Sequence, residues 1–224
     1  MRRTDAEIQQ AVLRELKWDT RVDETDVGVE VDGGIVTLTG TVNGWAKRVA
    51  AQESAHRVLG VLDVANDIQV RVPGTAGRTD TEIAQAVRNA LEWDIFVPES
   101  RIRSTVSNGQ VTLVGDVDFW NQREDAEKAV RNLAGVRRVS NLIEIKPPKV
   151  LPHDVRKSIQ EALERQAERE AGRIDLFVTD DRVSLSGTVH SWMEHEAVLG
   201  AARATPGVRS VEDHLRIQPA ALAL

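Results

Sequence analysis

The sequence predicts an α+β fold of three tandem α-β-β-α-β modules, each a three-stranded mixed sheet packed by two helices on one face. The segment GIVTLTGTVNGW at 34–45 recurs as GQVTLVGDVDFW at 109–120 and as DRVSLSGTVHSW at 181–192. Within each copy, hydrophobic residues follow the helical period, then alternate as in two strands, then show a second helix and a third strand. We therefore divide the chain into modules at 1–74, 75–148 and 149–218, with a short tail at 219–224.

A capping signal marks the start of the first helix in two of the three copies. TDAE at 4–7 and TDTE at 79–82 place a hydroxyl at the N-cap and a glutamate three residues later. The third copy lacks this signal, and its helical pattern continues to about Gly172, so we expect a longer helix. Trp18 and Trp93 end the helix in the first two copies, and we expect both rings to be buried against the following hairpin.

Two sets of repeated glycines and one polar position mark the rest of each module. The first set occupies an inward position of the second strand, where we expect close approach of a helix backbone: Gly40, Gly115 and Gly187. The second set follows the second helix and suits a left-handed conformation: Gly60, Gly135 and Gly207. The polar residue begins the third strand, and we expect its side chain to bond local backbone: Asn66, Asn141 and Asp213.

These motifs carry a family resemblance. G-x-V-x-L-x-G-x-V stands at 34–42 and 109–117, with Asp181 replacing the first glycine of the third copy. G-V-x-x-V-x-N stands at 60–66 and 135–141, and the third copy ends this motif with Asp213. The pattern resembles the BON domain, named for bacterial osmotically induced and nodulation proteins. The resemblance implies an α/β sandwich, binding to phospholipid membranes, and protection against osmotic or envelope stress. Many members are periplasmic, with a signal peptide or lipid anchor, whereas this sequence shows neither pattern.

Composition narrows the range of functions. The formal net charge is -6, and each copy is net negative. Tight nucleic-acid binding needs a concentrated Lys/Arg footprint, so we expect no nucleic-acid partner. The absence of cysteine excludes disulfides and thiolate chemistry. The chain has no apolar run of roughly eighteen residues and no signal-peptide core, so we expect a cytoplasmic protein.

No motif in the sequence predicts catalysis, a cofactor or a metal site. His190 and His195 are not at the i,i+4 spacing of a helical metal pair, and no further ligand motif supports them. Asp116 and Asp118 share the outward face of a strand and could act as paired carboxylates or hold a cation; solvated surface charge is the simpler interpretation. We therefore expect a protein that is not an enzyme.

The second helices carry the candidate contact residues. An indole ring at the helix start suits a membrane interface or a partner pocket, although packing on its own module is the simpler interpretation: Trp45, Trp120 and Trp192. Basic residues on these helices could face phosphate, or could simply be solvated: Lys47, Arg48, Arg123, Lys128 and Arg131.

The sequence thus leaves two functional hypotheses open. The first is a stress-associated, non-catalytic protein that uses three BON-like modules for weak multivalent binding to a phospholipid surface. The alternative is a protein-protein interaction or self-associating scaffold module without lipid binding, which would use strand edges or sheet faces such as the one where Phe177 has outward parity.

Overall fold

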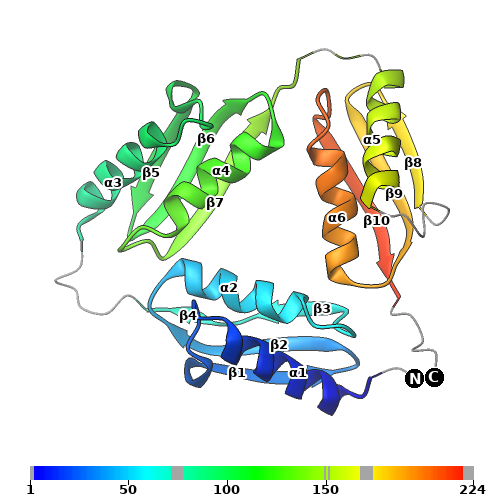
Figure 1. Ribbon diagram of the computed structural model, residues 1–224. Coiled ribbons are helices and arrows are strands. Elements are labelled where there is room, and N and C mark those ends of the chain that lie inside the picture. Colours follow the sequence, from blue (N-terminus) through cyan, green and yellow to red (C-terminus); the bar gives the residue numbers. More distant parts are fainter. Residues whose placement is uncertain (1–2, 72–77, 149, 151, 167–173, 219–224) are drawn as a thin grey trace.

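The computed structural model describes residues 3–71, 78–148, 150, 152–166 and 174–218, and in them it contains three separate sheets, each packed by two α-helices (Figure 1). The α+β fold predicted from the repeats is therefore confirmed. The predicted extension of the third module's first helix toward Gly172 lies outside the described residues, as do the tail at 219–224 and most of the linker at 73–78.

In the first module the second strand is the centre of the sheet. The elements are α1 (Asp5–Trp18), the 3-10 turn η1 (Glu24–Asp26), β1 (Val27–Asp32), β2 (Ile35–Val42), α2 (Trp45–His56), β3 (Asp63–Asn66) and β4 (Gln69–Val70). β1 pairs with β2 in antiparallel fashion, and β3 and β4 pair with β2 in parallel on its other side. The predicted third strand is thus present, but it is interrupted after Asn66.

The other two modules repeat this arrangement with an uninterrupted third strand. The second contains α3 (Asp80–Trp93), η2 (Glu99–Arg101), β5 (Ile102–Ser107), β6 (Gln110–Val117), α4 (Trp120–Arg131) and β7 (Arg138–Ile145). The third contains α5 (Pro152–Gln166), β8 (Ile174–Thr179), β9 (Arg182–Val189), α6 (Trp192–Arg203) and β10 (Ser210–Ile217). In both, the central strand pairs antiparallel with the strand before it and parallel with the strand after the second helix.

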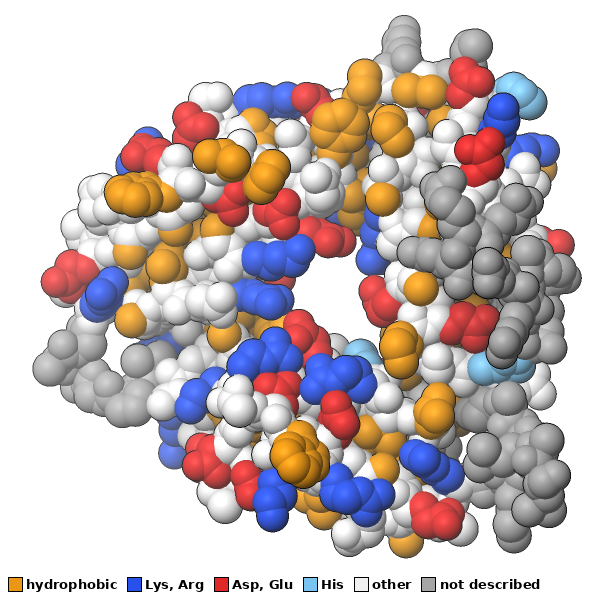
Figure 2. Space-filling view, viewed as in Figure 1, with side chains coloured by type: hydrophobic (Ala, Val, Ile, Leu, Met, Phe, Trp, Pro, Cys, Tyr) orange, Lys and Arg blue, Asp and Glu red, His pale blue; other side chains and the backbone are white. Residues whose placement is uncertain are grey.

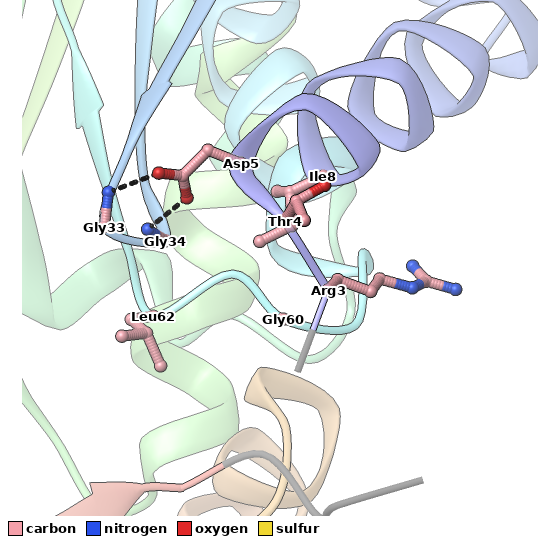
Figure 3. A pocket seen from close by; sticks show the side chains of 8 residues that line it. All are labelled: Arg3, Thr4, Asp5, Ile8, Gly33, Gly34, Gly60 and Leu62. Carbon is pink, nitrogen blue, oxygen red and sulfur yellow. Dashed lines mark hydrogen bonds between the residues drawn. The ribbon is translucent and has the colours of Figure 1, made fainter. Parts of the chain in front are cut away.

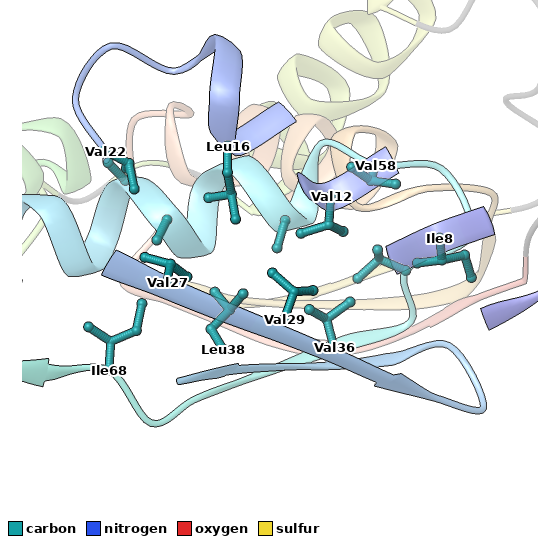
Figure 4. Packing of buried hydrophobic residues seen from close by; sticks show 14 of the residues in the cluster. Ile8, Val12, Leu16, Val22, Val27, Val29, Val36, Leu38, Val58 and Ile68 are labelled. Atoms are coloured by element: carbon teal, nitrogen blue, oxygen red, sulfur yellow. The ribbon is translucent and has the colours of Figure 1, made fainter. Parts of the chain in front are cut away.

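Each module has its own hydrophobic core between the helices and one face of its sheet. In the first module, the stripe of α1 that includes Val12 and Leu16 packs over Val36 and Leu38 of β2 (Figure 4). All four side chains are fully buried. Burial of such a side chain stabilises the fold by about 1.5–3 kcal/mol, so each module is held together mainly by this helix-to-sheet contact.

An aspartate at the start of the first helix fastens the helix to the hairpin turn. Both oxygens of Asp5 accept hydrogen bonds from the backbone N–H groups of Gly33 and Gly34, each at 2.9 Å (Figure 3). Asp80 makes the same pair of bonds in the second module. The predicted capping boxes are confirmed beside them, at Thr4 and Thr79. A pocket of about 410 Å³ lies at this corner. Because the turn amides already use both Asp5 oxygens, we interpret it as part of this structural contact.

The strand glycines correct one expectation. Gly40 has a φ of +122°, and a Cβ built there would lie 2.0 Å from the carbonyl oxygen of Asp26. Gly115 meets the carbonyl of Arg101 in the same way, at 2.1 Å. The backbone that approaches is therefore the 3-10 turn before the first strand, and not one of the two α-helices. Gly187 shares the positive φ, at +131°.

The glycines after the second helices behave as predicted. They adopt a positive φ at all three positions: Gly60 at +100°, Gly135 at +96° and Gly207 at +92°. In the first two modules they also stand close to the first helix, since a Cβ would lie 3.2 Å from Ile8 or 2.8 Å from Ile83. These glycines therefore allow the chain to turn at the end of the second helix, directly beneath the first helix.

The three modules are arranged around a common centre, toward which α2, α4 and α6 face (Figure 1). The space-filling view shows an opening at this centre, with side chains of both charge signs around it (Figure 2). Because α2, α4 and α6 face this centre, the second helices lie where the modules meet, and they carry most of the predicted candidate residues (Figure 1).

None of the helices in the described part of the chain is long and apolar enough to span a membrane.

Candidate functional site

The three tryptophans that begin the second helices are half-buried where modules meet. Trp192 donates from Nε1 to the carbonyl oxygen of Leu62 in the first module, at 3.1 Å, and packs against that module's core. Trp45 packs against the core of the second module. Trp120 has the guanidinium of Arg203, from the third module, 5.3 Å from its ring centre. These rings therefore serve contacts between modules, and the structure does not present them as freely exposed anchors.

Two of the predicted phosphate-facing arginines are tied to the protein backbone. Arg48 donates from Nε to the carbonyl oxygen of Ile68 at 3.0 Å and from Nη2 to that of Asn66. Asn66 returns a bond from Nδ2 to the carbonyl oxygen of Arg48, at 3.0 Å. The guanidinium also lies 5.1 Å from the ring centre of Trp45. Arg48 thus connects the second helix to the third strand.

The second module repeats this contact, and the third replaces it. Arg123 donates to the carbonyl oxygen of Asn141 at 3.1 Å, and Asn141 donates back to that of Arg123 at 2.8 Å. In the third copy the corresponding residues are His195 and Asp213, whose Nε2 and Oδ2 atoms lie 2.8 Å apart. The prediction that this polar residue bonds local backbone is confirmed, because its oxygen accepts from the backbone N–H two residues later in all three modules. Its expected place at the strand start is wrong, because Asn66 is the last residue of β3 and Asn141 and Asp213 lie inside β7 and β10.

The remaining basic candidates do not form one patch. Arg131 reaches Glu53 of the first module at 3.6 Å, which makes it a contact between modules. Lys128 pairs with Asp125 of its own helix at 3.2 Å. Lys47 is half-buried and helps to lower the pKa of Asp23, after the hydrogen bonds that Thr25 gives. Arg131 and Lys128 are paired with acidic side chains and Lys47 acts on Asp23, which weakens the case for a phosphate site on the second helices.

The paired aspartates of the second module are held by a cation from the protein itself. Arg101 donates from Nη1 to Asp118 at 2.9 Å and from Nε to Asp116 at 3.1 Å. These bonds hold the pKa of Asp116 below its usual value, with help from Lys146. The expectation of merely solvated charge was therefore incomplete. In the described residues, no cluster of three or more His, Asp or Glu side chains could hold a metal ion.

Sequence reasoning placed the other two tryptophans wrongly. Trp18 is 82% exposed and Trp93 is 86% exposed, although both were expected to pack on the hairpin. Leu16 and Leu91 are the last buried residues of their helices. A residue two positions later lies about 200° further around the helix, so its ring points to solvent. The offset from the buried stripe was the signal that could have revealed this.

The exposed tryptophan of the second module belongs to a larger apolar tip, defined here as Trp93, Ile95 and Phe96. Ile95 is 89% exposed and Phe96 is 64% exposed. The first module has Thr20 and Arg21 at the two matching positions, and Arg21 is ion-paired to Asp19 and Glu53. Adjacent exposed side chains of this size are uncommon on a protein surface and mark contact sites. The apolar tip is thus the strongest candidate binding surface in the described residues.

Comparison with known proteins agrees with the repeats. The family model for the BON domain matches residues 4–72, 79–147 and 153–219. Osmotically-inducible protein Y of Escherichia coli (strain K12) is 31% identical over 148 residues, which cover 63% of this chain and 73% of the relative.

Two solved structures of CdsD, a structural protein of the Type III secretion system of Chlamydia trachomatis, are distantly similar. The C-terminal domain is 12% identical with a TM-score of 0.28, over 97% of this chain and 100% of that one. The other is 13% identical with a TM-score of 0.28, over 94% and 92%. At these scores no functional argument follows from them. The three module matches, together with the conserved placement of motifs in each copy, show that this chain belongs to the BON domain family.

Proposed function

We propose that this chain is a stress-associated, non-catalytic binding protein that contacts a phospholipid surface weakly, chiefly through the apolar tip of the second module. The relation to an osmotically inducible protein supports the association with stress. The exposure of Trp93, Ile95 and Phe96 is the observation that carries the lipid contact. An indole ring is amphipathic and suits the boundary between headgroups and acyl chains.

The first module offers a second, weaker contact of the same kind. Trp18 is as exposed as Trp93, but its neighbours Thr20 and Arg21 are polar. The third copy has Arg165 at this position. Two contacts on one chain add avidity when both reach the same surface, because the second binds at a high effective concentration. In this proposal the multivalent contact uses Trp18 and Trp93 at the ends of the first helices. The tryptophans at the starts of the second helices lie between modules and do not contribute to it.

Sedimentation with liposomes tests the proposal. The full chain is mixed with zwitterionic and with anionic vesicles at low and at physiological salt, and Trp emission is recorded in the same samples. We expect vesicle binding with a blue shift, and a several-fold loss of binding in a Trp93→Ser, Ile95→Thr, Phe96→Arg variant. The last two changes install the residues that the first module has at these positions.

A matched control separates the tip from general surface hydrophobicity. Phe177→Ser removes another exposed aromatic side chain, 66% exposed on the open sheet face of the third module, and should leave vesicle binding unchanged. Absence of binding by the wild-type chain under every condition would remove the lipid proposal.

A second candidate function is docking to a protein partner. Leu142 and Phe177 are exposed on the sheet faces away from the helices, at 62% and 66%. In the sequence, Asp94 lies between Trp93 and Ile95 and Glu99 follows Phe96 by three residues, and both charges would disfavour a strongly anionic membrane. Loss of a recovered partner in the Phe177→Ser variant would favour this function.

A cytoplasmic location, expected from the sequence, stays a prediction that cell fractionation would check.

A further inference from the structure

The contact between the third and first modules closes the arrangement without a linker. Consecutive modules are connected by the chain, whereas the third meets the first only through non-covalent contacts. There, the ring of Trp192 stacks on His56 with 4.2 Å between ring centres and 19° between planes. The same indole donates its N–H to Leu62. Trp192 is therefore the centre of this closing contact.

The groups that flank the indole differ between the closing contact and the one between the second and third modules. Trp120 lies between two guanidinium groups, with its own Arg123 at 5.4 Å and Arg203 of the third module at 5.3 Å. In the repeat alignment, Arg203 corresponds to His56 and Arg123 corresponds to His195. Both permanent cations are thus replaced by histidines at the closing contact. Histidine is the side chain that titrates near neutral pH.

Of the two histidines that flank Trp192, His195 is the one whose pKa is raised. Its ring lies edge-on to Trp192, with centres 4.9 Å apart, and its side chain is 8% exposed. The Glu196 carboxylate, 3.7 Å from Nδ1, raises the pKa of His195, and Asp213 adds to this against the opposing effect of burial. Both acidic partners belong to the third module, so His195 keeps them whether or not the modules touch.

His56 is in the opposite situation. It is the last residue of α2, and burial lowers its pKa. The charged groups that face it are Glu196 and Asp63, which favour its protonation, and His195, which opposes it. Its burial involves the stacked indole of another module, and opening the contact would return the imidazole to water. The state of contact therefore affects how readily His56 takes up a proton.

We propose that His56 makes the closing contact between the third and first modules sensitive to pH, so that acidification opens the arrangement at Trp192. In the closed form, the stacked indole holds a protonated His56 partly out of water, and the positive charge of His195 opposes that protonation. The guanidinium groups beside Trp120 are weakly hydrated and keep their charge throughout the same pH range, so that contact lacks this sensitivity. Because its pKa is lower when closed than when open, closure is strongest above the ordinary histidine pKa of about 6.5 and weakens as pH falls below it. Uptake of one proton limits the change to about tenfold in the closed-to-open ratio per pH unit.

The absence of cysteine allows a direct test with paired fluorescent labels. One pair spans the closing contact, at Leu59→Cys and Met193→Cys, two exposed positions. A matched pair spans the contact between the second and third modules, at Asn121→Cys and Pro206→Cys, which occupy the same repeat positions. Energy transfer is measured in the full chain from about pH 7.5 to about pH 5, the range in which histidine titrates.

We expect transfer across the closing contact to fall on acidification, while the matched pair stays constant and circular dichroism shows intact modules. His56→Gln cannot be protonated and should abolish the fall. His195→Arg combined with Asp213→Asn installs the residues of the other modules and should preserve it, because His56 remains. Constant or rising transfer, an equal fall in both pairs, or a fall that persists in His56→Gln would each overturn the proposal. Vesicle binding is not used as a readout, so this result is independent of the proposed function.

Discussion

Replacement of Gly40 by alanine should strongly destabilise the first module's sheet, and the structure gives the size of the effect. The backbone at Gly40 has a φ of +122°, in a region that side chains avoid at a cost of about 1–3 kcal/mol. A Cβ would also stand 2.0 Å from the Asp26 carbonyl oxygen, far inside ordinary contact distance. The 3-10 turn must therefore move away from β2.

That movement would disturb the pair formed by Gly40 and Val27, whose side chain is buried in the core. Exposure of a valine costs up to about 1.5–3 kcal/mol. Together the two effects amount to about 2.5–6 kcal/mol, a large part of the roughly 4–10 kcal/mol expected for a module of this length. Gly33→Ala is the matched control, because its φ is +57° and no atom lies within 4 Å of the added Cβ. Its cost should be only about 1–2 kcal/mol.

Amide hydrogen exchange of β1 and β2 measures this difference within the first module alone. Gly40→Ala should reduce protection by roughly a hundredfold or more, and Gly33→Ala by roughly tenfold, since 1.4 kcal/mol corresponds to a factor of ten. Equal losses in the two variants would refute the argument from the Asp26 carbonyl.

Two further predictions concern polar contacts that the repeats share. Asp5→Ala removes the acceptor of two turn amides and should destabilise the first module by about 1–3 kcal/mol, measured as lost protection of the Gly33 and Gly34 amides; unchanged protection would show that the turn holds itself. Asp213→Asn removes one of the two acids that raise the pKa of His195, so that pKa, followed by NMR of the imidazole, should fall toward its ordinary value; no shift would show that Glu196 acts alone. A histidine whose pKa is raised in the folded state stabilises that state at pH values below the unfolded pKa of about 6.5. This contribution is lost as pH rises through the folded pKa. The variant should therefore lower the third module's stability most at mildly acidic pH.

The module fold could be predicted from the sequence because its signals are local. Capping boxes, hairpin turns and the glycines after the second helices act within a few residues of the chain. The capping boxes occur in two copies and the glycines in all three, so the repeats reinforced one another. The glycine in the second strand was also found, but its reason was not, because the approaching carbonyl comes from a turn fourteen residues earlier in the chain.

The sequence by itself thus determined the fold of each module and the presence of three of them. Only the tertiary structure decided which surfaces remain open. A tryptophan at a helix start is compatible with packing on its own module, on a neighbour or on a ligand, since burial of an indole is favourable in all three cases. The folded chain uses Trp45, Trp120 and Trp192 in contacts between modules and brings His56 against Trp192 from a distant part of the chain. It leaves Trp93, Ile95 and Phe96 exposed side by side as the apolar tip.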